Sequence, residues 1–255
     1  MRVLAIDTAT LTGSIALVDH DGLVRAESAL YMQGAHSAVI VESIRSLLAQ
    51  SKCELDSIDA FAAGLGPGSF TGIRIGVSIV KGFGLATNKP VYGVGSLELL
   101  AASVLGASGP VVSAIDARRN EVFFAVYSRG EDGALTVIAE PEHREPEKTG
   151  ARIAEILQGA QATVIGDLDD GLRARVREGA RYIQAASGES ANPALVFAPR
   201  AMGTPLARVL ASEVIAGRAV LDTGAMEPRY VRPTDAKLPA KALLVSGSSA
   251  GGQPS

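Results

Sequence analysis

A glycine-rich stretch, FAAGLGPGSFTGIRIGVSIVKGFG (residues 61–84), has the composition of a loop that could hold phosphate. Residues 61–64 have the pattern of a strand end, the GPG tripeptide at 66–68 breaks regular structure, and Ser69 can cap a following helix. The free amides at such a helix N-terminus attract anions. However, the spacing is neither GxxxxGK[ST] nor GxGxxG, and no lysine lies in the first helical turn. Phosphate binding is therefore open at this stretch, but the pattern does not favour it.

The glycines of the same stretch also have a helical spacing. A helix predicted over residues 70–86 carries Gly72, Gly76 and Gly84 on one side, in line with Gly68 before it. Each interior glycine destabilises a helix by about 0.5–1 kcal/mol relative to alanine. Close approach of another backbone is the usual compensation. That backbone could belong to the same chain or to a partner.

The sequence around this stretch alternates between strand and helix patterns. We predict strands at residues 3–7, 13–18, 91–94, 163–165 and 182–184. We predict helices at residues 37–50, 70–86, 97–105 and 151–158, and within 194–216. Ser37 and Ser96 could cap the helices that follow them. The residues beyond 233, which end in SGSSAGGQPS, are expected to be disordered.

The order of elements restarts in the middle of the chain. VSAIDARRNEVFFAVYSRGEDG (residues 112–133) aligns with VLAIDTATLTGSIALVDHDG (residues 3–22). Both read as strand, aspartate, loop, strand and turn, which predicts a duplicated fold. We place an N-terminal subdomain at residues 1–108 and a C-terminal subdomain at residues 109–232.

Two such hairpins resemble those of actin, the sugar kinases and the Hsp70 ATPase, where the matching aspartates and loops hold magnesium and nucleotide phosphates. The resemblance places Asp7, Thr8 and Thr10 in the first loop and Asp116 in the second. The alternative is that each aspartate only accepts hydrogen bonds from nearby amides. Arg118 and Arg119 make the second loop a poor phosphate cradle, although arginine can hold an anion or a partner carboxylate.

Composition excludes several kinds of site. His20, His36 and His143 are far apart and lack HxxxH spacing, so a protein-ligated metal is not expected. The one GxSxG match, GSSAG at residues 247–251, lies in the small, polar tail and not between a strand and a helix, so no nucleophile elbow is expected. The single Cys53 excludes an internal disulfide and fits a reducing compartment.

Charge and hydropathy indicate an ordinary globular chain. A hydrophobic content of 47% over 255 residues is enough for a sizeable core. With a net charge of −3, the chain alone is not expected to bind nucleic acid strongly. No secretion signal and no apolar run of membrane-spanning length is evident, so we expect a cytoplasmic protein without membrane contact.

Five motifs together resemble the bacterial TsaB family, also called YeaZ: AGLGPGSFTGIRIG, IDTAT, AHS, SAIDARRNEVF and MEPRYVRP. The resemblance runs from Met1 to about Arg232. It implies a two-subdomain, actin/Hsp70-like α/β fold of the duplicated, ribonuclease H-like kind. It also implies a non-catalytic paralogue of TsaD, within the machinery that makes threonylcarbamoyladenosine in ANN-decoding tRNAs. TsaD carries an HxxxH metal pair where this chain has Ser96 and Leu100, so the ligands are absent. The first helix also departs from the family, with HSAVIVE in place of HSExLLP.

The resemblance implies partners as well. A TsaD-type catalytic subunit is expected to form a heterodimer with this chain through the N-terminal helices, with a TsaE-type ATPase as a further partner. Contact with tRNA is expected only through the complex, and the chain alone could form a homodimer. No cofactor is expected in this chain, whereas ATP and metal are expected on the partner subunits.

These expectations give two candidate sites. We predict a partner-binding helix seam made by Ile40, Ile44, Leu47, Gly68, Gly72 and Gly76. We also predict a nucleotide or interface loop made by Asp7, Thr8, Asp116, Arg118 and Arg119, and no catalytic residue. The alternative function is an active ATP-dependent transferase or kinase of the actin-like fold, and a peptidase is a third hypothesis.

Overall fold

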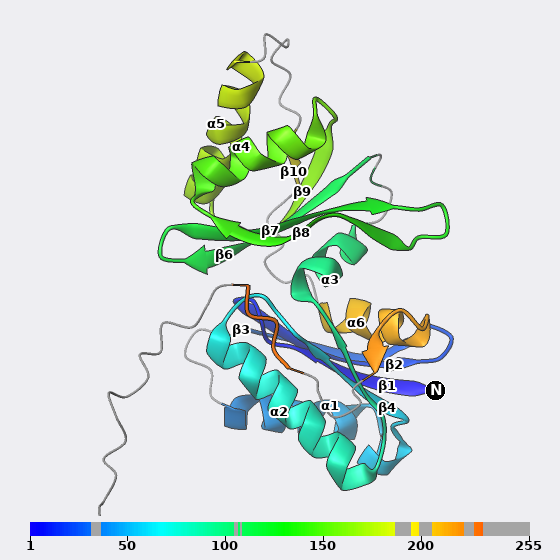
Figure 1. The fold of residues 1–255 in the computed structure, drawn as a ribbon. Helices are drawn as coiled ribbons and strands as arrows, with labels where there is room; N and C mark the ends of the chain where they lie inside the picture. Colours follow the sequence, from blue (N-terminus) through cyan, green and yellow to red (C-terminus); the bar gives the residue numbers. More distant parts are fainter. Residues whose placement is uncertain are drawn as a thin grey trace, which may run out of the picture.

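The computed structural model describes residues 1–31, 37–104, 107, 109–186, 195–198, 206–221 and 227–231. Within them, two mixed β-sheets lie one above the other, with helices between them and on both outer faces (Figure 1). His36 and the tail predicted to be disordered lie outside the described residues, as does the side chain of Ser37. None of the helices in these ranges combines the length and apolarity that crossing a membrane requires.

The first sheet has the strand order β11-β5-β4-β1-β2-β3. Its strands are β1 (Arg2–Asp7), β2 (Thr12–Asp19), β3 (Val24–Tyr31), β4 (Ala60–Gly64), β5 (Val91–Val94) and β11 (Val220–Leu221). The first three strands form an antiparallel meander, and β4 and β5 continue the sheet in parallel with β1.

The second sheet repeats this plan with the order β10-β9-β6-β7-β8. Its strands are β6 (Val111–Arg118), β7 (Glu121–Arg129), β8 (Leu135–Arg144), β9 (Ala162–Asp167) and β10 (Leu195–Phe197). Here too an antiparallel meander is followed by two parallel strands. The duplication predicted from the sequence is therefore confirmed, and with it the α/β fold class.

The helices complete a layered arrangement around three apolar clusters. α1 (Ser37–Gln50) and α2 (Phe70–Thr87) cover the outer face of the first sheet, and α4 (Pro146–Leu157) and α5 (Asp170–Ala186) cover that of the second (Figure 1). α3 (Ser96–Ser103) and α6 (Leu206–Ile215) lie between the sheets. A short 3₁₀ helix, η1 (Leu55–Ser57), precedes β4. Along the inner strands β1, β2, β4, β6, β7 and β9, alternating residues belong to the two clusters on the two faces of the sheet, as period-two side chains require.

Each of the two inner helices packs mainly on the sheet other than the one whose strand it follows in the sequence, so the helices are exchanged between the sheets. α3 follows the first sheet but packs on β6 and β7 of the second. α6 follows the second sheet but packs on β1 and β2 of the first, where Ala207 N–H donates to Ser14 Oγ at 3.0 Å. The expected division at residue 108 is corrected in this respect, because α6 and β11 complete the N-terminal sheet. Burying both inner sheet faces favours this exchange over two separate units.

Most predicted elements are present, but three points need correction. The strand expected at residues 182–184 is wrong, because these residues continue α5, whose Val176 and Ala180 are buried one helical turn apart. The four strands at the sheet edges, β3, β8, β10 and β11, were not predicted. Ser69 caps α2 as expected, since its Oγ accepts from Gly72 N–H at 3.2 Å. Ser96 instead begins α3 as its first residue, after the N-cap Gly95.

The glycine stripe of α2 packs inside the chain, so the predicted partner-binding seam is wrong at these positions. A Cβ on Gly72 would lie 2.0 Å from the carbonyl oxygen of Thr8, and one on Gly76 would lie 2.5 Å from Thr8 Oγ1. At Gly68 a Cβ would lie 2.2 Å from the carbonyl oxygen of Ala9. The backbone that compensates for the glycines is therefore the β1–β2 loop of the same chain.

The apolar residues expected in the same seam are also internal. Ile40, Ile44 and Leu47 of α1 are at most 4% exposed and pack against the first sheet. The helical spacing found their common face correctly, but the hydrophobic effect places that face on the sheet and not in solvent. Val39 and Val41, on other sides of α1, are large hydrophobic residues of this helix that are exposed, at 48% and 47%.

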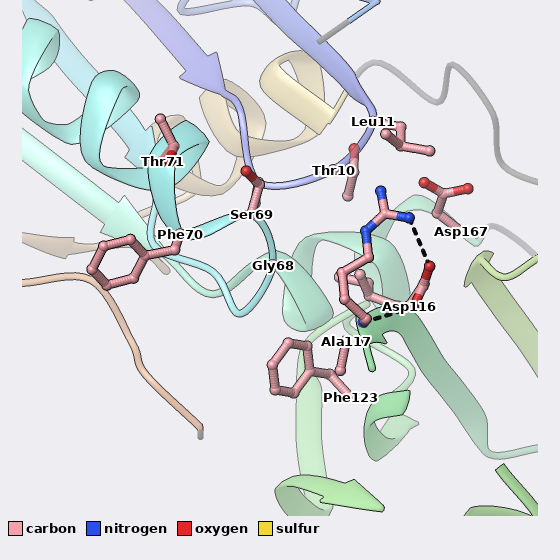
Figure 2. A pocket seen from close by; sticks show the side chains of 13 residues that line it. Thr10, Leu11, Gly68, Ser69, Phe70, Thr71, Asp116, Ala117, Phe123 and Asp167 are labelled. Atoms are coloured by element: carbon pink, nitrogen blue, oxygen red, sulfur yellow. Dashed lines mark hydrogen bonds and ion pairs between the residues drawn. The ribbon is translucent and has the colours of Figure 1, made fainter. Parts of the chain in front are cut away.

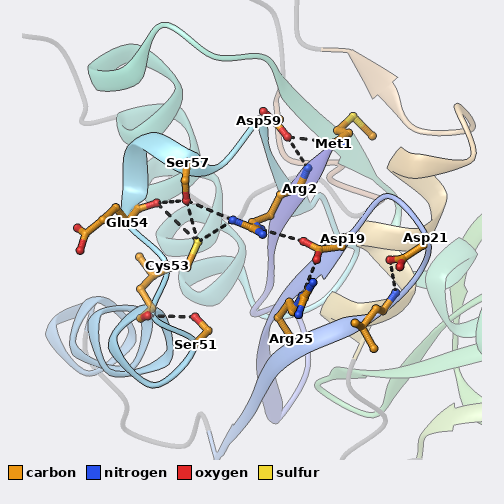
Figure 3. A network of polar contacts seen from close by, with 12 residues as sticks. Met1, Arg2, Asp19, Asp21, Arg25, Ser51, Cys53, Glu54, Ser57 and Asp59 are labelled. Atoms are coloured by element: carbon orange, nitrogen blue, oxygen red, sulfur yellow. Dashed lines mark hydrogen bonds and ion pairs between the residues drawn. The ribbon is translucent and has the colours of Figure 1, made fainter.

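A polar network fixes the start of β1 (Figure 3). Arg2 Nε donates to one oxygen of Asp19 at 2.8 Å, and Arg25 Nε donates to the other at 2.5 Å. The hydrogen bond from Arg2 is the main cause that holds the pKa of Asp19 below its usual range. Cys53, a buried free thiol, lies within the same network beside Ser57.

We expect Gly72→Ala to destabilise the chain by about 1–3 kcal/mol, because the added carbon meets a backbone carbonyl that cannot move away. Gly82→Ala in the same helix is the matched control, since a Cβ there meets nothing within 4 Å. It should stabilise α2 by about 0.5–1 kcal/mol. Urea unfolding measures both, and equal stability of the two variants would contradict the intramolecular seam.

Candidate functional site: the interdomain cleft and the outer face of α2

A cleft of about 390 Å³ lies where the two hairpins face each other. One wall is the β1–β2 loop together with the N-terminus of α2, and the other is formed by the ends of β6, β7 and β9 (Figure 2). The lining residues are Ala9, Thr10, Leu11, Gly68, Ser69, Phe70 and Thr71 on the first wall, and Ile115, Asp116, Ala117, Arg118, Phe123 and Asp167 on the second.

Of the two carboxylates on the second wall, that of Asp116 accepts hydrogen bonds from its own loop. Arg118 N–H donates to Asp116 Oδ1 at 2.7 Å, and Arg118 Nη1 donates to Asp116 Oδ2 at 3.0 Å. Arg118, Arg119 and Asn120 have φ angles of 59°, 53° and 62°, so the turn from β6 into β7 is left-handed throughout. This conformation folds the guanidinium of Arg118 back over Asp116, while Arg119 is exposed at the turn.

Asp7 lies beneath the first wall and does not line the cleft. Its side chain is fully buried, with Oδ1 accepting from Ala9 N–H at 3.3 Å and Oδ2 accepting from Ser96 Oγ at 3.1 Å. Gly66 N–H donates to the same Ser96 hydroxyl at 3.2 Å. Burial raises the pKa of Asp7 to about 6, and these hydrogen bonds oppose the rise. A Cβ on Gly64 would lie 1.8 Å from Asp7 Oδ2, so the carboxylate also depends on a glycine beside it.

Thr8 has an equally internal role. It is 2% exposed, and its hydroxyl donates to the carbonyl oxygen of Gly72 at 2.6 Å. The predicted loop residues therefore separate into two groups. Asp7 and Thr8 hold α2 and α3 against β1, whereas Asp116 and Arg118 reach the cleft. Sequence reasoning did not identify Asp167 or Phe123, because the strand pattern does not show that the end of β9 lies beside Asp116.

The outer face of α2 carries a second surface that the sequence analysis missed. A groove of about 380 Å³ runs along it, lined by Phe70, Thr71, Arg74, Ile75, Ser78 and Ile79. Tyr230, from the far end of the described chain, stacks beside Phe70 with ring centroids 5.3 Å apart. The available signal was that α2 is apolar on two faces, one with the glycines and one with Ile75 and Ile79.

Among the described residues, no three His, Cys, Asp or Glu side chains come together as metal ligands. Ser96 and Leu100, which stand at the expected ligand positions of the paralogue, are 0% and 2% exposed. Ser96 is bound to Asp7, and Leu100 belongs to the core between the sheets.

Two ribonuclease H-like units that face each other across a cleft define the actin/Hsp70-like class of α/β proteins. The family model for TsaD, tRNA N6-adenosine threonylcarbamoyltransferase, matches residues 31–162, just over half of the chain. YeaZ from Pseudomonas aeruginosa superposes with a TM-score of 0.69 and 26% identity, over 90% of this chain and 99% of that one. The chain belongs to the TsaB (YeaZ) family.

Curated relatives agree with this assignment. The tRNA threonylcarbamoyladenosine biosynthesis protein TsaB of Escherichia coli K12 is 43% identical over 135 residues, which cover 52% of this chain and 58% of that protein. The protein of the same name from Bacillus subtilis 168 is 35% identical over 127 residues, covering 50% and 55%. The chain thus spans about half the length of the curated relatives it matches. A Pseudomonas aeruginosa structure described as similar to peptidase YEAZ, at 24% identity, shares the fold.

The pKa of Asp7 gives a pH-dependent stability. The folded-state pKa of about 6 lies above the ordinary value of 3.8, so the protonated form is favoured by folding. The resulting stability is present below about pH 4 and is lost as the pH rises through about 6. The free energy of unfolding of the Asp7→Asn variant does not contain this loss. We therefore expect it to rise, relative to that of wild type, by on the order of 3 kcal/mol when the pH is raised from 4 to 8. Urea unfolding of both proteins at the two pH values measures this.

Asp56→Asn, at an exposed position, is the control for removal of one carboxylate. If the difference in free energy of unfolding between the Asp7→Asn variant and wild type is the same at pH 4 and pH 8, burial does not raise the pKa of Asp7 and this prediction is wrong.

Proposed function

We propose that the chain is a non-catalytic subunit that binds and activates a TsaD-type catalytic subunit in forming threonylcarbamoyladenosine in ANN-decoding tRNAs. Membership of the TsaB family supports this role. The observation that carries it is the second apolar face of α2, where Phe70 is 42% and Leu85 88% exposed. An 18-residue helix with one face on the sheet and a grooved apolar face in solvent has the form of a docking element.

The proposed docking surface replaces the glycine seam. It consists of the solvent-facing sides of α1 and α2, which cover the same face of the first sheet (Figure 1). Val39 and Val41 contribute from α1, and Ile75 and Ile79 line the groove on α2. A helical partner could pack its own apolar stripe along this groove. The same surface could pair two copies of the chain when the partner is absent.

The cleft gives less support to the alternative of an ATP-dependent transferase or kinase. Asp7 is buried beneath the loop, and both oxygens of Asp116 accept hydrogen bonds from Arg118. A magnesium–phosphate site would need these carboxylates open to the ligand. We therefore assign ATP and metal to the partner subunits, including a TsaE-type ATPase, and tRNA contact to the whole complex in the cytoplasm.

We expect Ser78→Arg to abolish binding of the TsaD-type subunit, because a long charged side chain would fill the groove. Ala174→Arg on α5 is the matched control, since it is also an exposed small residue on a helix. Titration calorimetry measures affinity, and tRNA modification in the reconstituted system measures activation. The control should behave as wild type in both, and Asp116→Asn should still support modification.

Two results would contradict the proposal. One is modification of tRNA at the full rate when this chain is left out of the reconstituted system. The other is modified tRNA formed by this chain without any TsaD-type subunit, which would favour the transferase.

A further inference from the structure

We propose that Arg74, held between Phe70 and Tyr230 on the outer face of α2, binds a carboxylate of the partner subunit. This inference rests on the proposed function and adds the chemistry of the contact. It also assigns a role to residues 227–231, the last described segment of the chain.

The guanidinium of Arg74 is oriented by two aromatic rings. Its central carbon lies 3.9 Å from the centroid of the Phe70 ring, and its Nε donates to the hydroxyl of Tyr230 at 3.0 Å. The two rings themselves pack together at 5.3 Å. The Nε donor of the planar guanidinium thus holds the side chain in place. The Nη1 and Nη2 donors are therefore already oriented before any ligand binds.

The positive charge of Arg74 has no acidic counterpart in the part of the chain that the structure describes. Arg45 on the neighbouring helix gives the contrast, because its Nε and Nη2 donate to Glu42 at 3.0 and 2.7 Å. Arg74 makes no comparable ion pair, although it is exposed and lines the apolar groove with Ile75 and Ile79. A fixed arginine beside aromatic rings is typical of the residues that dominate the energy of protein interfaces.

The ligand that fits best is a protein carboxylate. A planar guanidinium with two free ends pairs with a carboxylate through two parallel hydrogen bonds. Phosphate has similar geometry, but RNA would bring a hydrophilic backbone onto an apolar groove, and the chain has a net charge of −3. A partner helix with an aspartate or glutamate on an apolar face fits both features, because its apolar residues would pack in the groove and its carboxylate would pair with Arg74.

The C-terminal segment completes this surface. Arg229 N–H donates to the carbonyl oxygen of Leu65 at 2.7 Å, and Arg229 Nη1 lies 3.9 Å from Glu98 Oε2. These contacts anchor the residue next to Tyr230 on the loop before α2 and on α3. The tyrosine hydroxyl is therefore held in place by the folded core, 156 positions along the chain from the arginine it orients.

The experiment is calorimetric titration of the TsaD-type subunit with four variants of the full chain. Arg74→Ala should weaken binding by roughly ten- to a hundredfold, and Arg74→Lys should recover little, because lysine lacks the planar fork. Tyr230→Phe keeps the ring and removes the hydroxyl, so a loss of several-fold is expected. Arg181→Ala, at an exposed arginine of α5, is the control and should bind as wild type. The affinity of wild type should also fall more steeply with salt than that of Arg74→Ala.

Thermal unfolding of each variant is the control for folding, and we expect the variants to unfold as wild type does because the substituted side chains are exposed. If Arg74→Ala binds as tightly as Arg181→Ala while Ser78→Arg does not bind, the assignment to Arg74 is wrong and the proposed function stands. If wild type itself does not bind, the proposed function fails first. If Arg74→Ala dissociates a homodimer but leaves the affinity for the TsaD-type subunit unchanged, the carboxylate belongs to a second copy, which also overturns the proposal.

Discussion

The arrangement of the first unit depends on the direct contact between α2 and the β1–β2 loop. The helix lies so close to this loop that Gly72 and Gly76 leave no space for a side chain next to Thr8, and Gly68 leaves none next to Ala9. Thr8 adds a hydrogen bond to the helix backbone at 2.6 Å. This contact decides two things at once. It places the N-terminus of α2 at the cleft, and it turns the opposite face of the helix towards solvent.

The buried pair of Asp7 and Ser96 supports the same contact from below. Asp7 accepts from the loop amide of Ala9 and from Ser96, and Ser96 accepts from Gly66 in the loop before α2. One carboxylate thereby links the first strand, the glycine-rich loop and α3. In an actin-like enzyme an aspartate at a strand end would be open to a ligand. In this chain the carboxylate of Asp7 is buried and has a structural role, and its burial raises its pKa.

The exchange of α3 and α6 joins the two units and fixes the cleft between them. Each helix follows one sheet and packs on the other, so the cluster between the sheets contains residues from both halves. The C-terminal segment also packs on the first unit. Arg229 contacts α3 and the loop before α2, and Tyr230 contacts α2. The surface around α2 thus combines a helix from the first third of the chain with the last described segment.

The sequence by itself determined the elements that depend on local pattern. Helical spacing identified α1 and α2, the hydroxyl of Ser69 marked a helix start, and the repeated aspartate hairpins indicated a duplicated α/β fold. Local pattern could not determine which face of α2 is buried, because both of its faces are apolar or small. It also could not show that Asp7 is covered, or that Tyr230 reaches Arg74. These features depend on contacts between residues far apart in the chain, and only the packed tertiary structure decides which backbone fills the space left by a glycine.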